Sequence, residues 1–526
     1  MKLSAQMLIL CVSLFIVVFD NISFFQHVNE VYHLSWQNAG FFLSLGAILT
    51  ALLVIVSSLF RSRLTLKPVL IGLLLLSAGT NYFMNTYNVI LDETMIQNTF
   101  ETNVNESLDL LTGKLVAYMV LLGVIPSFLV YRVRIHEEEC KKAFFSALKS
   151  IVLALLIAVV MLFAFNRFYT SFFRENKSLR YYTNPTYCLY SAGQFIYHKF
   201  VSNDTSFKPL GEDATLKVHE KRRLSIIVVG EAARANRFSL NGYERKTNPL
   251  LEKENVINLF NVSSCGTSTA ISVPCMFSYL DREHYSDQAA KSMENVLDIL
   301  KRAGVSVLWR DNNSDSKGVA LRVNYEDYKV SSNNRVCDEE CRDEGMLIGL
   351  QEFVNAQKGD IVIVLHQMGN HGPAYYKRYP KAFESFKPVC LTNQVEKCSP
   401  EEIGNAYDNA ILYTDYFLSK TIAFLKQNDA QFETAMIYMA DHGESLGEKG
   451  LYLHGIPYML APEEQTHVGA MLWFGQQSEQ RINTQGLREN AQKAYSHDNL
   501  FHTILGLTGV QTAVYNPSLD MLLYKQ

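Results

Sequence analysis

Polar residues of the kinds that bind metal ions follow three short apolar stretches in the C-terminal part of this chain. Glu231 comes just after "LSIIVVG", His366 and His371 come at and after the end of "DIVIVLH", and Asp441 and His442 follow "AMIYMA". If these stretches are strands of one parallel sheet, the residues converge, because sites in such sheets lie beyond the carboxyl ends of the strands. Carboxylate and imidazole groups together suit zinc. Each residue alone could instead cap a helix or satisfy a loop, but a set drawn from three stretches is harder to explain in that way.

The segment "SSCGTSTAISVPCMFS", residues 263–278, is a rich source of hydroxyl groups. It places seven hydroxyl side chains between and around Cys265 and Cys275. A free alcohol is a poor nucleophile at neutral pH, but coordination to a divalent cation lowers its pKa and aligns it for attack. A metal site completed by one of these hydroxyls would therefore suit nucleophilic chemistry.

The elements that must position these residues follow an α/β pattern. Short β-branched runs, such as "LSIIVV", "VSVLWR" and "DIVIVLH", alternate with helical stretches such as "SMENVLDILKRAG". This alternation predicts an α/β domain with a largely parallel central sheet flanked by helices. The roughly three hundred residues involved are enough to bury the core of a single domain.

The first third of the chain has a different composition. The mean hydropathy of zero and the net charge of -4 are averages over two unlike parts. Five apolar runs reach about the 20 residues that cross a bilayer, and they cover residues 7–25, 39–60, 68–87, 115–131 and 144–165. Buried core helices are the alternative, which five runs in series with short polar joints disfavour. We therefore expect a five-helix transmembrane bundle.

Lys and Arg in the joints predict the orientation of this bundle. "RSRLTLK" and "YRVRIHEEECKK" are basic, whereas residues 26–37 and 88–113 contain neither Lys nor Arg. Cationic joints stay on the cytoplasmic side of a membrane. The N-terminus is thus predicted to be cytoplasmic, and an odd number of spans places the C-terminal domain on the outer face of the membrane without a cleavable signal peptide.

Cysteine spacing fits an oxidising compartment. Six of the nine cysteines form close sequence pairs in the part expected outside the cytoplasm, namely Cys265/Cys275, Cys337/Cys341 and Cys390/Cys398. Local disulfides explain this spacing best. Connectivity does not follow from sequence, however, and a zinc site is the alternative for "CDEEC". Cys188 is left without a partner.

The segment "NRFYTSFFRENKSLRYYTNPTY" mixes aromatic and basic side chains after the last apolar run. Such side chains suit the headgroup layer of a membrane. We therefore predict a transmembrane domain at residues 1–165, an interfacial connector at 166–220 and a catalytic domain at 221–526. An ordinary linker whose aromatic side chains pack on the soluble domain is the alternative.

Five longer motifs carry a resemblance to a known family. They are "VVGEAARANRFSLNGYERKTNP", "SCGTSTAISVPCMFS", "WRDNNSDSKG", "HQMGNHGPAYYKRYP" and "DHGESLGEKGLYLHG", in this order behind the apolar runs. Over essentially its whole length, the chain resembles the membrane-bound phosphoethanolamine transferases, above all the lipid A-modifying branch that includes the mobile colistin-resistance enzymes. The resemblance implies a catalytic domain with the alkaline phosphatase and sulfatase fold.

The resemblance assigns a nucleophile and a metal site by position in these motifs. Thr269, the second threonine of "CGTSTA", matches the nucleophile of the family. Glu231, Asp441 and His442 match the ligands that join it around one tightly bound zinc ion. A disulfide between Cys265 and Cys275 would clamp the loop that presents Thr269.

The resemblance also implies a site for the donor headgroup. Its residues would be Asn313, Lys317, His371 and His454. His371 and His454 are in addition candidates to hold a second zinc ion or to protonate a leaving oxygen. Ala232 departs from the family pattern, because relatives often carry Thr or Ser after the metal-binding Glu, and this leaves the rigidity of the loop open.

The implied reaction moves phosphoethanolamine from phosphatidylethanolamine to a lipid A phosphate through a phosphoethanolamine-Thr269 intermediate, with release of diacylglycerol. The chain has no GxxxxGK loop for a nucleotide, which favours a donor supplied by the membrane itself. The added ammonium group should weaken the binding of cationic peptides such as polymyxin (colistin) through the surface field of the membrane. We expect no nucleic-acid partner.

Other activities are compatible with the same motifs. A core sugar or another surface glycan could be the acceptor, and a phosphoglycerol transferase or a hydrolase would share the metal site and the threonine. A membrane transporter or sensor with a structural metal is the non-enzymatic alternative. Few ionisable residues, Asp20 among them, lie within the apolar runs, and this argues against a transporter.

Overall fold

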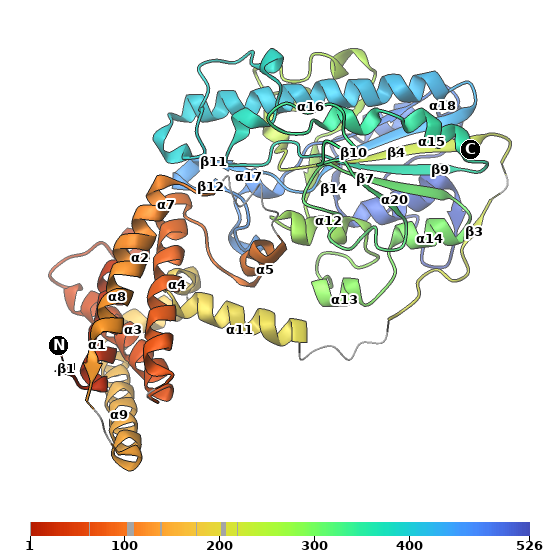
Figure 1. The fold of residues 1–526 in the computed structure, drawn as a ribbon. Helices are drawn as coiled ribbons and strands as arrows, with labels where there is room; N and C mark the ends of the chain where they lie inside the picture. Colours follow the sequence, from red (N-terminus) through yellow and green to blue (C-terminus); the bar gives the residue numbers. More distant parts are fainter. Residues whose placement is uncertain are drawn as a thin grey trace. The chain divides into compact units, whose positions relative to one another are not determined.

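The computed structural model describes residues 2–62, 64–101, 110–136, 139–174, 176–200, 207–217 and 219–525 (Figure 1). The chain divides into two compact units, one formed by Met1–Ile96 and Leu111–Tyr197 and the other by Gln97–Leu110 and His198–Gln526. Within the predicted connector, residues 175, 201–206 and 218 lie outside the described residues.

The first unit is helical. Its elements up to the last long helix are α1 (Ala5–Phe19), α2 (Ile22–Tyr32), α3 (Ala39–Leu59), α4 (Leu66–Tyr87), α5 (Glu93–Glu101, which continues into the second unit), α7 (Gly113–Tyr118), the π-helical η1 (Met119–Val124), α8 (Ile125–Arg132) and α9 (Cys140–Ala164). A short parallel pairing joins β1 (Lys2–Leu3) to β2 (Arg134–Ile135), so the start of the chain lies beside the end of α8.

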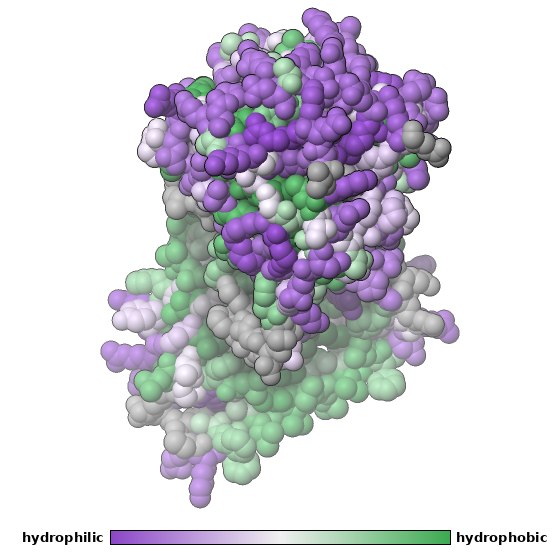
Figure 2. Space-filling model, turned by 90° about the vertical axis from the view of Figure 1, so that its right-hand side faces the viewer, coloured by the Kyte–Doolittle hydropathy of each residue, from purple (hydrophilic) through white to green (hydrophobic). Residues whose placement is uncertain are grey.

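Four segments of the described residues are long and apolar enough to cross a membrane: α3, α4, the continuous stretch Gly113–Arg132, and Lys141–Ala164 of α9. The pair α1 and α2 adds a fifth if it counts as one span, although the two helices meet at a bend of 55°. Figure 2 shows a largely hydrophobic surface over this unit, and side chains such as Leu156 and Phe163 are exposed on it. A surface of this kind is suited to lipid rather than to water.

Buried polar side chains form the bend between α1 and α2. Asp20 and Asn21 are each 1% exposed. Asn81 of α4 donates a hydrogen bond to Asp20 Oδ1 (3.1 Å), while Asn21 Nδ2 donates to the Asn184 carbonyl (2.8 Å) and Asn184 N–H donates to Asn21 Oδ1 (2.9 Å). Because helix ends leave backbone groups unsatisfied, these contacts explain why the apolar run predicted at residues 7–25 is interrupted at Asp20.

The part of the connector that belongs to the first unit contains α10 (Asn166–Arg174), η2 (Lys177–Tyr182) and α11 (Thr186–Phe200), whose last residues after Tyr197 belong to the second unit. Tyr169 and Phe172 are buried among the helices of the first unit, and Phe168 stacks on Phe41 of α3 with ring centroids 4.8 Å apart. These aromatic side chains thus pack within the first unit, whereas the linker alternative had placed them on the soluble domain.

The second unit is built around a seven-stranded sheet with the order β5-β13-β10-β4-β9-β7-β8. The strands are β4 (Arg222–Gly230), β5 (Ile257–Leu259), β7 (Ser306–Asp311), β8 (Asn324–Asp327), β9 (Ile361–His366), β10 (Phe432–Ala440) and β13 (Ala470–Phe474). The strands from β10 to β8 run parallel, but β13 is antiparallel to both β10 and β5. The sheet is thus largely parallel, as expected, and β13 makes it a mixed sheet.

Helices cover both faces of this sheet. In Figure 1, α16 (Pro400–Asn428) lies along one face, while α12 (Thr269–Phe277), α14 (Val296–Arg302) and α20 (Asp498–Thr508) lie on the other. α16 begins at a capping box in which the Ser399 hydroxyl accepts from Glu402 N–H and the Glu402 carboxylate accepts from Ser399 N–H. Pro400 suits the first helical position, so the sequence defines this helix start locally.

The remaining elements of the second unit are short. The helices are α13 (Asp287–Lys291), α15 (Leu350–Ala356), α17 (Glu463–Thr466), α18 (Ser478–Arg481) and α19 (Thr484–Glu489), and the paired strands are β3 (Thr215–Leu216) with β15 (Val510–Gln511), β6 (Asn261–Ser263) with β14 (Ala494–Ser496), and β11 (Ser445–Leu446) with β12 (Tyr452–Leu453).

The second unit contains three disulfides: Cys265–Cys275, Cys337–Cys341 and Cys390–Cys398. The two cysteines of "CDEEC" are thus bonded to each other, in contrast to the zinc alternative. Cys188 of the first unit is buried and makes no disulfide.

Candidate active site

Two carboxylates leave the sheet from neighbouring parallel strands. β4 and β10 pair in register as far as Gly230 opposite Ala440, so the next residues, Glu231 and Asp441, emerge side by side. Both side chains are fully buried. Backbone N–H groups of Ala232 and His442 donate to Asp441 Oδ1 (3.1 and 2.7 Å), which fixes this carboxylate at the sheet edge.

Thr269 meets these residues from the other side. It is the first residue of α12, and its Oγ1 donates to Glu231 Oε2 (2.9 Å) and lies 3.3 Å from His442 Nε2. His442 Nε2 lies 3.2 Å from Glu231 Oε1 and 3.4 Å from Asp441 Oδ2. We refer to Glu231, Thr269, Asp441 and His442 as the Thr269 cluster. Its position at a helix N-terminus also favours an anionic ligand such as a phosphate.

The atoms of the Thr269 cluster fit a divalent cation. Glu231 Oε1 and Asp441 Oδ2 are buried, and within the described part of the chain they have no hydrogen-bond partner. His442 Nδ1 donates to the Gly443 carbonyl (2.8 Å), which directs Nε2 at the cluster. One ligand atom from each of Glu231, Asp441 and His442 lies within 4.8 Å of the others. This set of oxygen and imidazole donors suits zinc and also admits manganese.

The charges of the cluster favour a cation at the same place. Burial, together with the neighbouring Glu231 carboxylate, raises the pKa of Asp441 to about 7. Burial alone would raise the pKa of Glu231 as well, but the His442 imidazole holds it well below its usual range. Burial alone would lower the pKa of His442, yet the two carboxylates raise it to about 10. The carboxylates thus attract positive charge to Nε2, where a metal ion could replace the proton.

Two contacts and the disulfide fix the loop that carries Thr269. The Cys265–Cys275 disulfide joins this loop to α12. Cys265 N–H donates to His497 Nδ1 (3.0 Å), and His497 Nε2 donates to the Ala440 carbonyl (2.9 Å). Thr267 Oγ1 donates to the Ile456 carbonyl (2.7 Å). His497 therefore connects the loop of the candidate nucleophile with the strand that ends just before Asp441.

A second group of ionisable side chains adjoins the cluster. Glu444 is fully buried, accepts a hydrogen bond from the Tyr375 hydroxyl (2.6 Å), and lies 2.7 Å from His454 Nδ1. The ring centroid of His454 lies 4.3 Å from that of His442 and 5.5 Å from that of His371. His442, Glu444 and His454 have the geometry of a further metal-binding group. Glu444 was not among the residues that the sequence analysis named.

The other two residues predicted for the donor headgroup have different surroundings. Asn313 Nδ2 donates to Glu231 Oε2 (2.8 Å) and to the Gln367 carbonyl (2.7 Å), so this amide orients a carboxylate of the cluster. Lys317 is 8% exposed and lines a cavity of about 170 Å³ together with Ser278. The structure thus brings Asn313, His371 and His454 to the cluster, and it places Lys317 on a small cavity that is also lined by Pro274 of α12.

Ala232 adopts a left-handed backbone with φ of 52°, which is unfavourable for a residue with a Cβ atom. Tyr407 holds this conformation, because its hydroxyl donates to the Ala232 carbonyl (2.5 Å) and accepts from Arg234 N–H (3.0 Å). The Ala232 N–H donates in turn to Asp441. The loop after β4 is therefore fixed through its backbone.

Comparisons with known proteins connect this geometry to a family. The sulfatase family model matches residues 223–510, and the model of phosphoethanolamine transferase EptA/EptB matches residues 49–200. The chain is 45% identical over 492 residues to the phosphatidylethanolamine transferase Mcr-1 of Escherichia coli, with 91% of each chain covered. The chain belongs to the phosphoethanolamine transferase family. This assignment confirms the resemblance stated from the sequence motifs.

Two further relatives of this transferase cover nearly the whole chain. The phosphoethanolamine transferase EptA of Escherichia coli strain K12 is 39% identical over 525 residues, which are 98% of this chain and 96% of the relative. The solved structure of the integral membrane protein lipooligosaccharide phosphoethanolamine transferase A from Neisseria meningitidis is 35% identical and matches with a TM-score of 0.95 over 99% of both chains. These relatives identify the chain as a transferase rather than a transporter or a sensor.

Three residues beside the site were missed by the sequence analysis. Glu444 stands three positions after Asp441 in "DHGES", so the rule of strand ends could have found it. Tyr375 and His497 gave no such signal, since each is a single residue in an irregular stretch. His497 reaches the site because β14 pairs with β6, with Ser496 opposite Ser263.

His497→Ala should lower the kcat of this transferase and its melting temperature. Burial lowers the pKa of His497 to about 4, so the imidazole is neutral and can accept from Cys265 N–H and donate to the Ala440 carbonyl. Removal of the imidazole leaves these two buried backbone groups unpaired, and each costs about 1–3 kcal/mol of stability. His502→Ala is the matched control, because His502 is also buried with a pKa of about 4 and accepts from Asn516 N–H (3.1 Å). Steady-state transfer at a temperature where both variants are folded checks this prediction. The same kcat in both variants would limit His497 to a stabilising role.

Proposed function

We propose that this transferase moves phosphoethanolamine from phosphatidylethanolamine to a phosphate of lipid A through a covalent intermediate on Thr269. In the first step the bond between Thr269 Oγ1 and phosphorus forms, the bond from phosphorus to the glycerol oxygen breaks, and diacylglycerol leaves with a proton. In the second step an oxygen of the lipid A phosphate forms a bond to the same phosphorus, the bond from phosphorus to Thr269 Oγ1 breaks, and Thr269 takes up the proton of the attacking phosphate group.

The observation that carries this proposal is the position of Thr269 Oγ1, 2.9 Å from Glu231 and 3.3 Å from His442 Nε2 in a buried cluster of metal-binding type. A hydroxyl that only capped a helix would accept a hydrogen bond from a nearby backbone N–H. Thr269 Oγ1 instead donates to the cluster, which is the arrangement expected of a nucleophile. The relatives Mcr-1 and EptA, whose names state phosphatidylethanolamine or phosphoethanolamine transfer, support the donor.

The side chains around Thr269 would bind the metal ion, orient its ligands and bind the substrate phosphate. Glu231, Asp441, His442 and Thr269 would hold one zinc ion, which, when bound, would lower the pKa of the Thr269 hydroxyl and stabilise negative charge on the phosphoryl group. Asn313 orients Glu231 through its amide. Glu444 positions His454, and His454 or His371 would protonate the leaving oxygen or hold a second zinc ion. Lys317, a compact cation, would bind a phosphate of a substrate.

The membrane location follows from the same proposal. The first 165 residues would cross a bacterial inner membrane five times with the N-terminus in the cytoplasm, residues 166–220 would form an interfacial connector, and residues 221–526 would form the periplasmic catalytic domain. Basic joints on one side of the apolar helices support this orientation. The three disulfides of the second unit support an oxidising compartment.

Mass spectrometry of lipid A from cells with and without this chain tests the acceptor. We expect a mass increment of one phosphoethanolamine on lipid A, together with survival at higher polymyxin concentrations, because the added ammonium group offsets anionic charge. Cells that produce Thr269→Ala are the control and should show neither change. An increment on a core sugar alone would contradict the lipid A acceptor, and an added phosphoglycerol would contradict the donor.

A further inference from the structure

A large apolar groove lies within the first unit, on residues to which the transfer reaction gives no role. The groove is the cavity of about 890 Å³ between α1, α3 and α9, a volume in the range of ligand pockets. Leu10, Leu14, Leu43, Leu153 and Ile157 line it with side chains that are 38–77% exposed. The middle of the groove is apolar because the Thr50 hydroxyl donates to the Gly46 carbonyl of its own helix (2.8 Å).

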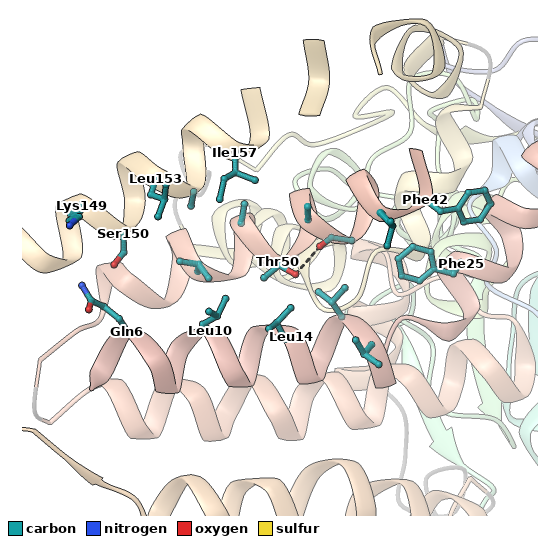
Figure 3. A pocket seen from close by; sticks show the side chains of 18 residues that line it. Gln6, Leu10, Leu14, Phe25, Phe42, Thr50, Lys149, Ser150, Leu153 and Ile157 are labelled. Atoms are coloured by element: carbon teal, nitrogen blue, oxygen red, sulfur yellow. Dashed lines mark hydrogen bonds between the residues drawn. The ribbon is translucent and has the colours of Figure 1, made fainter. Parts of the chain in front are cut away.

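Polar side chains gather at one end of this groove. Figure 3 shows Gln6, Lys149 and Ser150 at that end and the rings of Phe25 and Phe42 at the opposite end. Gln6 Nε2 donates to the Ser146 carbonyl (3.2 Å), which joins α1 to α9 at the polar end. No carboxylate of the described residues forms an ion pair with the Lys149 ammonium. The groove therefore combines an apolar channel with one positive charge at its polar end.

The dimensions of the groove indicate what fills it in a bilayer. From Gln6 to Val18, α1 rises about 18 Å at 1.5 Å per residue, comparable to one leaflet of a hydrocarbon core that is about 30 Å thick. A helix is about 10 Å across with its side chains. One acyl chain is thinner, and apolar walls exclude water as the alternative filling.

We propose that this groove binds an anionic glycerophospholipid, with one acyl chain between α1, α3 and α9 and its phosphate at the Lys149 ammonium. The Gln6 amide and the Ser150 hydroxyl lie at the same end, but both already donate to the Ser146 carbonyl (3.2 and 3.0 Å), so the Lys149 ammonium is the group that would meet the phosphate. Under the proposed orientation, the end with Gln6 and Lys149 faces the cytoplasm, so the lipid comes from the cytoplasmic leaflet. The bound molecule is therefore a lipid of the first unit and not the donor at the Thr269 cluster.

Native mass spectrometry of the full-length protein, titrated with phosphatidylglycerol or with phosphatidylcholine of the same acyl chains, tests this site. We expect phosphatidylglycerol to bind about fivefold more tightly, the effect of one Lys near an anionic headgroup. Lys149→Gln should abolish the preference. Lys142→Gln is the matched control, because Lys142 is an exposed lysine of the same helix that does not line the groove, and this variant should keep the preference.

A second variant tests the acyl-chain part of the groove. Ala154→Phe places a large ring among the apolar lining and should weaken the binding of both lipids, whatever their headgroup. Equal loss of preference in Lys149→Gln and Lys142→Gln would overturn the proposal, since general surface charge would then explain it. Undiminished binding of both lipids by Ala154→Phe would overturn it as well. Lipid retention is measured apart from transfer, so the outcome is independent of the proposed reaction.

Discussion

Thr269→Ala should abolish phosphoethanolamine transfer while the protein remains folded. We expect a loss of at least about 1,000-fold in kcat, because removal of a nucleophile eliminates the covalent route. Incubation of the wild type with phosphatidylethanolamine and no acceptor should leave phosphoethanolamine on the peptide that contains Cys265 and Cys275, and the variant should show no adduct. Glu231 Oε2 still accepts from Asn313 in the variant, so the fold loses little.

Two neighbouring substitutions make this test specific. Ser268→Ala is the matched control, because Ser268 is adjacent and buried, and its Oγ has no hydrogen-bond partner among the described residues. It should retain the adduct and nearly normal transfer. Thr269→Ser keeps the oxygen but loses the methyl group that restricts χ1, so partial activity is expected. Unimpaired turnover by Thr269→Ala would falsify the assignment and direct attention to Thr267 or Ser268.

The convergence of Glu231, Asp441 and His442 was accessible from the sequence for a physical reason. Each follows a short apolar run, and residues just past parallel strands share one edge of a sheet. Gly230 pairs with Ala440 in the sheet, so the residues that follow them, Glu231 and Asp441, lie next to each other. Thr269 required more than this rule, because several hydroxyls in its segment are chemically equivalent by sequence and only the family motifs singled one out.

The remaining contacts depend on pairings that no local pattern encodes. Strand direction does not change the alternation of side chains, so the antiparallel β13 within the sheet had no signature in the sequence. The interruption of the first apolar run at Asp20 arises from Asn81 and Asn184, which are distant in sequence. His497 is a similar case, since it contacts Cys265 across 232 positions.

Asp441→Asn should release the metal ion and eliminate transfer. An amide is a weaker metal ligand than a carboxylate. Loss of a group that only orients a ligand lowers metal affinity about 10–100-fold, so we expect loss of the ligand itself to lower the affinity by a larger factor. The measurement is the zinc content per chain by inductively coupled plasma mass spectrometry, alongside transfer activity. Treatment of the wild type with a chelator should give the same inactive state, and added zinc should restore the wild type but not the variant.

Asp415→Asn is the control that separates metal loss from the loss of any buried carboxylate. Asp415 of α16 is also fully buried, and burial raises its pKa to about 7, as for Asp441. It accepts from the backbone N–H groups of Leu250 and Leu251 (2.9 and 3.0 Å) rather than facing the cluster. Asp415→Asn should therefore lower the melting temperature but retain zinc and kcat. Full zinc occupancy in Asp441→Asn would show that this carboxylate is not a ligand, and the proposed site would then have to be rebuilt around Glu231 and His442.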